Sequence, residues 1–143
     1  METVNTLNNL LSRNYDAEKG FKLVADKTEN PVLKNYFTKN SEMHRKFGHD
    51  IKAEITHLGG KIDKGSSIEG DLHRGWLTVK SALVGNTNEA LVNECERGQK
   101  VAMEDYQEAV DHLDDSNLTA KLASHKAEIV DVVGELRTLE LTT

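Results

Sequence analysis

Apolar residues recur at alternating steps of three and four along four segments of this chain. This spacing places them on one face of an α-helix. In the first segment the apolar face runs from Val4 through Leu11 to Phe21, and in the second from Leu33 through Phe47 to Leu58. The pattern predicts four long helices, at about residues 3–28, 31–58, 87–113 and 117–140.

The breaks between these segments carry helix start and stop signals. Asn30 can cap a helix, and Pro31 suits the first helical turn, where no N–H is needed. Gly59 and Gly60 form a C-terminal stop, and residues 114–117 make a short turn. The break before Pro31 and the turn at 114–117 are both short. The two helices on either side of each are therefore predicted to form an antiparallel hairpin.

Residues 59–86 form a much longer connection and contain a shorter amphipathic run at about 68–84, led by Trp76. A helix of the predicted length is about 39 Å long, which this connection can span. The prediction is all-α: a ferritin-like four-helix bundle in which a long crossover joins two antiparallel helical hairpins. A five-helix up-and-down array is the alternative. Gly20 is predicted on the outer face, where the crossover helix could pack.

Composition narrows the range of functions. The net charge of −6 argues against nucleic acid as a partner, because little would neutralise phosphates. Cys95 is the single cysteine, which excludes an internal disulfide and fits a reducing compartment. No apolar run approaches the ~18 residues of a membrane span, and no secretory signal is visible. We therefore expect a single cytoplasmic domain without membrane or nucleic-acid contacts.

Three of the apolar faces carry a titratable residue near their midpoint, namely Glu18, His44 and His125. We expect all three to point inward, with at least two within hydrogen-bonding or shared-ligand distance. A di-iron carboxylate site takes a Glu from each of two helices and a Glu-x-x-His pair from each of the others. Here the set is incomplete, although Glu94 and Glu128 lie close enough to be further metal candidates.

Three interpretations of these positions stay open. The first is one iron or zinc ion held by Glu18, His44 and either His125 or Glu128. The second is a dinuclear iron site. The third, which the sequence favours, is a buried hydrogen-bonded network in which Glu18 pairs with His44 or His125.

Five blocks of sequence carry a resemblance: EKGF at 18–21, LGG at 58–60, LHRGW at 72–76, ALVG at 82–85 and ECERG at 94–98. With these blocks in this order, the chain resembles a family of small bacterial proteins of unknown function that are classed as ferritin-like four-helix bundles. The resemblance implies the bundle with a crossover and brings no established activity, substrate or cofactor. It also places His125 where the family usually has glutamine, and Val133 where it tends to have histidine.

Two functional classes remain. The favoured one is a non-enzymatic structural or interaction protein, connected with stress, whose polar core positions are vestigial. The alternative is a metal-binding or redox protein that uses those positions. For assembly the hypothesis is a homodimer, because ferritin-like hairpins often associate side by side.

Overall fold

The computed structural model describes residues 2–63 and 88–140 of the chain. They form four helices of 26, 27, 25 and 25 residues: α1 (Glu2–Lys27), α2 (Pro31–His57), α5 (Asn88–His112) and α6 (Ser116–Glu140). Each helix end lies within one residue of its predicted position. No strand occurs in these two ranges, so the all-α prediction is confirmed. The predicted helix at about 68–84, with Trp76, lies outside the described residues.

The turn between α1 and α2 and the end of α2 form as their residues dictate. The Asn30 Oδ1 accepts hydrogen bonds from the backbone N–H groups of Val32 at 2.9 Å and Leu33 at 3.1 Å. These bonds satisfy two donors that the first helical turn would otherwise leave unpaired. Gly59 follows α2 with φ of 73°, a left-handed conformation that closes the helix and that L residues with a side chain rarely adopt.

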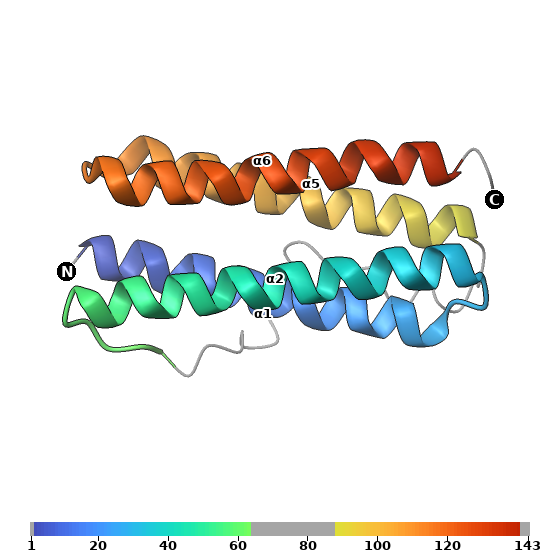
Figure 1. Cartoon of the computed structure of the whole chain (residues 1–143), viewed down its shortest axis with the longest axis horizontal. Coiled ribbons are helices and arrows are strands. Elements are labelled where there is room, and N and C mark those ends of the chain that lie inside the picture. The colour runs from blue at the N-terminus through green and yellow to red at the C-terminus, as the bar shows by residue number, and fades with distance from the viewer. Residues whose placement is uncertain (1, 64–87, 141–143) are drawn as a thin grey trace.

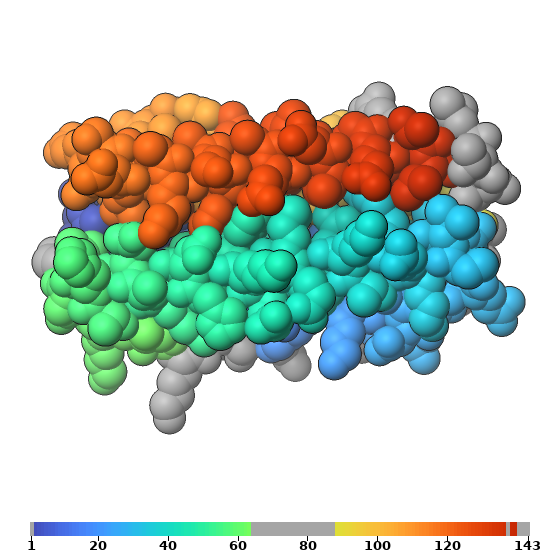
Figure 2. Space-filling model, viewed as in Figure 1, coloured from blue at the N-terminus to red at the C-terminus, as the bar shows by residue number. Residues whose placement is uncertain are grey.

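The two hairpins pack face to face along their whole length (Figure 1). α1 lies beside α5 and α2 beside α6, and neighbouring helices run antiparallel. α2 ends at one end of the bundle and α5 begins at the other, so the intervening connection joins opposite ends, as predicted. Since the hairpins contact each other directly, the described residues form a four-helix bundle and not an array with a helix between the hairpins. Figure 2 shows the face on which α6 lies against α2.

Two apolar clusters fill the bundle interior, one toward each end. One gathers the start of α1 and the end of α2, with Leu7, Leu11, Ile51 and Ile55 fully buried. The other gathers the opposite halves of these helices around Phe21 and Phe37. Each large apolar side chain buried in this way contributes roughly 1.5–3 kcal/mol. Between the clusters lies a layer of polar side chains.

The buried face of α1 is wider than the sequence pattern predicted. Gly20, which we expected on the outer face, is buried, as is its neighbour Asp16. The crossover helix predicted to pack on Gly20 lies outside the described residues, so that packing stays a prediction; α1 itself packs against both α2 and α5. Gly98 on α5 is also buried. In residues 2–63 and 88–140 no helix combines the length and apolar character that a membrane span requires.

Candidate functional site

The layer between the apolar clusters is a connected set of side chains from all four helices. We call it the polar belt and define it as Asn14, Asn40, His44, Asp50, Gln99, Tyr106 and His125. All except Asp50 are at most 3% exposed. Buried polar groups are stable only when they are hydrogen-bonded, so the partners of each member determine what the belt can do.

His44 lies at the centre of the belt on α2 and is 1% exposed. Its Nδ1 lies 2.8 Å from the Asn14 Oδ1 on α1, and its Nε2 lies 3.0 Å from the Gln99 Oε1 on α5. Its ring stacks on Phe21 at a centroid separation of 5.7 Å and meets the edge of Phe47. Both ring nitrogens are therefore occupied by protein partners.

The belt continues from His44 through Asn14 to the other histidine. The Asn14 Nδ2 donates to the Tyr106 hydroxyl at 2.9 Å, and that hydroxyl lies 3.0 Å from the His125 Nδ1. The His125 Nε2 lies 2.9 Å from the Asp50 Oδ2. Because the Asp50 side chain is 51% exposed, this end of the belt reaches solvent.

The electrostatics of the belt follow mainly from burial. Loss of solvation acts to lower the pKa of His44, whereas the hydrogen bond between its ring and Gln99 acts to raise it. Burial also lowers the pKa of His125, while the Asp50 carboxylate acts in the opposite direction. Burial raises the pKa of the Tyr106 phenol well above its ordinary value, so this group stays protonated.

The structure brings together only part of the predicted set. His44 and His125 are buried as expected, and Tyr106 and Asn14 connect them. Glu18 is half-buried, and the hydrogen bond it shares with α2 uses its main-chain oxygen, which accepts from the Ser41 hydroxyl at 2.9 Å. The network interpretation was right about a buried network and wrong about Glu18 as its member.

The other two carboxylates lie apart from the belt. Glu94 is buried and forms an ion pair with Arg97 on the same helix. Glu128 is exposed, although its charge influences the pKa of His125. Across the described ranges, no three His, Cys, Asp or Glu side chains converge in a way that could hold a metal ion. The metal set therefore remains a sequence prediction.

Sequence reasoning missed five members of the belt, including Asn40, which like Asn14 interrupts the apolar face of its helix. Asn14 and Tyr106 lie on their apolar faces, where a polar interruption and an aromatic residue were visible signals. Gln99 and Asp50 gave no signal, because each lies beside its helix's apolar face and glutamine and aspartate are common on helix surfaces.

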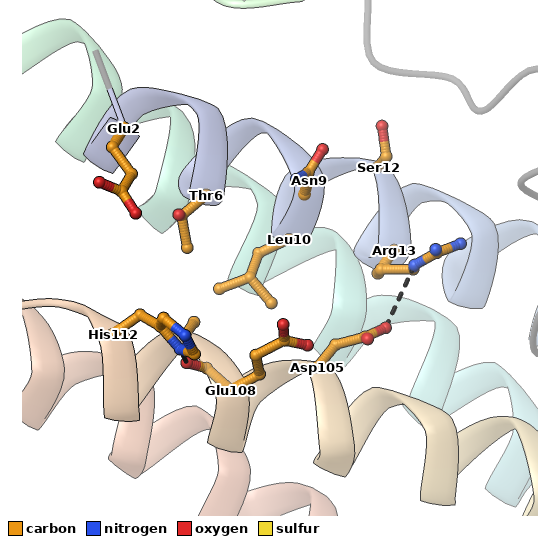
Figure 3. Close-up of a pocket in the computed structure, with 10 residues that line it drawn as sticks. Glu2, Thr6, Asn9, Leu10, Ser12, Arg13, Asp105, Glu108 and His112 are labelled. Carbon is orange, nitrogen blue, oxygen red and sulfur yellow. Dashed lines mark hydrogen bonds and ion pairs between the residues drawn. The ribbon is translucent and has the colours of Figure 1, made fainter.

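A groove of about 480 Å³ lies outside the core, between the first half of α1 and the second half of α5 (Figure 3). An ion pair between the Arg13 Nε and the Asp105 Oδ2, at 3.1 Å, joins the two helices at one end. Glu2 and His112 line the other end, Glu108 lies between the two ends, and Leu10 contributes apolar surface. The lining offers both charges and an apolar contact, which suits a partner side chain or a small polar molecule.

Comparison with known proteins places the chain in a family. The model of a family described as "Domain of unknown function (DUF2383)" matches residues 2–112. The chain belongs to this family. The match covers α1, α2 and α5, so His44 and both of its amide partners lie within the family region, while His125 on α6 lies beyond it. No curated protein matches the chain.

Proposed function

We propose that this chain is a non-enzymatic helical-bundle protein that acts through its surface, and that the polar belt serves the fold. The observation that carries the proposal is the closure of the belt. All four ring nitrogens of His44 and His125 are already hydrogen-bonded to side chains of other residues in the bundle.

A closed belt offers little to a metal ion or a substrate. A metal ligand must aim a bare ring nitrogen at the ion, together with ligands from other residues. Recruiting His44 for this purpose would break a buried hydrogen bond to Asn14 or Gln99. Leaving such a buried group without a partner costs about 1–3 kcal/mol, which metal binding would have to offset.

The belt has a structural task that its geometry supports. It joins residues from α1, α2, α5 and α6 in one layer, while the apolar clusters on either side make few directional contacts. Sliding one helix by a turn, about 5.4 Å, would keep much of the apolar packing but separate the hydrogen-bonded pairs that this helix makes with its neighbours. The belt therefore favours one alignment of the two hairpins over its neighbours.

The surface offers the groove between α1 and α5 as the place for an interaction. Larger apolar side chains exposed elsewhere in the described residues are few and scattered: Leu23, Val32, Leu58 and Val130. A second copy of the chain is the partner hypothesised from the sequence. Light scattering at high protein concentration tests it, and a mass near 15.9 kDa would remove the homodimer.

Metal analysis tests the main proposal against metal binding, its alternative. The chain is purified without an affinity tag and analysed for bound metal, then titrated with Zn²⁺ and with Fe²⁺ under anaerobic conditions while thermal unfolding is followed. We expect no stoichiometric metal and no rise in melting temperature. Glu18→Gln is the paired variant: a metal site would lose both metal and stability, whereas a closed belt predicts only a small change in stability. Stoichiometric metal that depends on His44 would refute the proposal.

A further inference from the structure

The amide groups beside His44 have a fixed orientation on both sides. The Asn14 Nδ2 donates to the main-chain oxygen of Leu10 at 3.0 Å and to the Tyr106 hydroxyl at 2.9 Å. The Leu10 oxygen can only accept a hydrogen bond, so it requires the NH₂ group of Asn14 on its side. The Asn14 Oδ1 is thereby turned toward the His44 Nδ1.

The other side is fixed through two amides in series. The Asn40 Nδ2 donates to the main-chain oxygen of Tyr36 at 2.9 Å, which leaves the Asn40 Oδ1 pointing toward Gln99. This oxygen accepts from the Gln99 Nε2 at 3.1 Å, so the Gln99 Oε1 must face the His44 Nε2. Both ring nitrogens of His44 therefore meet an oxygen that can only accept.

We propose that Asn14 and Gln99 form an amide cage that holds His44 as an imidazolium, with a proton on each ring nitrogen. A neutral imidazole has one N–H and one bare nitrogen. Either neutral tautomer would place its bare nitrogen against an amide oxygen 2.8 or 3.0 Å away. Rotating Asn14 would set its oxygen against the Leu10 oxygen, and rotating Gln99 would set its oxygen against Asn40.

The surroundings of His44 act on this charge from every helix. Phe21 on α1 presents a ring face, which attracts a cation, and Phe47 on α2 presents an edge contact. From α5 the partner is Gln99, and from α6 the titratable group is His125, which would disfavour the charge only in its own protonated form. Burial opposes the charge, since it acts to lower the pKa of the ring. The cage offsets these effects because both N–H groups of the charged ring meet an oxygen, and charge-assisted hydrogen bonds are stronger than neutral ones.

His125 provides an internal comparison. The Tyr106 hydroxyl accepts from Asn14, so its own proton is available to the His125 Nδ1, and the His125 Nε2 can donate to Asp50. One donor and one acceptor suit a neutral ring with its proton on Nε2. The two buried histidines should therefore differ in protonation in the same protein at the same pH.

Nitrogen NMR of the full chain, labelled with ¹⁵N in its histidine rings, tests this proposal directly. His44 is assigned through contacts to Phe21 and His125 through the signals lost in His125→Gln. Near pH 7 we expect a directly bonded proton on both nitrogens of His44 and on one nitrogen of His125. A bare ring nitrogen on His44 at this pH would overturn the proposal, and this measurement needs no variant of the cage.

A cage variant tests the cause. Gln99→Met removes the acceptor opposite Nε2 while keeping an unbranched side chain of similar length. His44 should then lose one of its two protons and keep the one on Nδ1, facing Asn14, while His125 is unchanged. Retention of both protons on His44 in folded Gln99→Met would show that the cage does not hold the charge.

Discussion

The hydroxyl of Tyr106 holds the two halves of the polar belt together, and its removal is the sharpest test of the belt's contribution to stability. It accepts from the Asn14 Nδ2 at 2.9 Å and lies 3.0 Å from the His125 Nδ1. Tyr106→Phe deletes this oxygen and leaves the ring, which is 1% exposed, to fill the same space. The change therefore isolates the hydrogen bonds from the apolar packing.

The expected magnitude follows from what each partner loses. Asn14 keeps its bond to the Leu10 oxygen, so its NH₂ group remains partly satisfied. The His125 Nδ1 loses its hydrogen-bond partner, the Tyr106 hydroxyl, and His125 is only 3% exposed. A buried group left without a partner costs about 1–3 kcal/mol. We expect the free energy of unfolding to fall by about 2 kcal/mol, which corresponds to roughly 4–8 °C in melting temperature for a chain of this size.

Urea denaturation followed by circular dichroism measures the change, with an unchanged slope as the sign that the unfolded state is unaffected. Tyr15→Phe is the matched control. The Tyr15 hydroxyl has no hydrogen bond to any described residue, its ring is half-buried, and Lys52 lies over that ring. The control should change stability by less than about 0.5 kcal/mol. Equal effects of the two substitutions would show that the belt's hydrogen bonds do not support the fold.

Three further predictions concern single positions. Gly134 is exposed inside α6, and a Cβ added there would meet no atom within 4 Å. Gly134→Ala should therefore raise the free energy of unfolding by about 0.5–1 kcal/mol in the same urea assay. A lower free energy of unfolding would contradict the open space. Gly60→Ala should lower it by about 1–3 kcal/mol, because the new Cβ would lie 2.7 Å from the Val4 Cγ2; a neutral effect would mean that the chain shifts there at little cost. The Cys95 thiol is fully buried and its pKa is raised by burial, so its reaction with a thiol-specific dye should be slow and should accelerate with unfolding by urea; fast labelling without denaturant would refute this.

The fold was predictable because its determinants are local and repeated. Each helix carries its apolar face over six or seven turns, so a single polar residue such as His44 does not obscure the period. The helix ends were predictable because their signals are local: Asn30 caps α2 with its own side chain, and Gly59 closes α2 with its own backbone conformation. The packing of α1 beside α5 was not predictable in this way, because no pattern within α1 encodes that neighbour.

The members of the belt were harder to predict, because position on a helix face does not determine where a flexible polar side chain ends. Glu18 and Asn14 share one face of α1, yet Asn14 is 1% exposed and Glu18 remains half-buried. A neutral amide can be buried with two or three hydrogen bonds, whereas a carboxylate retains a larger desolvation cost. Of these two residues of α1, the carboxylate therefore stayed at the edge.

The desolvation cost of a carboxylate also explains which hydrogen-bond acceptors face the two histidines. His125 lies near the surface, and its acceptor is the carboxylate of Asp50, whose side chain is 51% exposed and keeps water on its outer side. His44 lies deeper, where an ionised carboxylate would lose all of its hydration, and its acceptors are the oxygens of Asn14 and Gln99. An amide oxygen can accept a hydrogen bond with the same geometry as a carboxylate oxygen. It does so without bringing a negative charge into the core. The depth of each ring thus selects the chemistry of its partner, and this selection is visible only once the four helices are packed together.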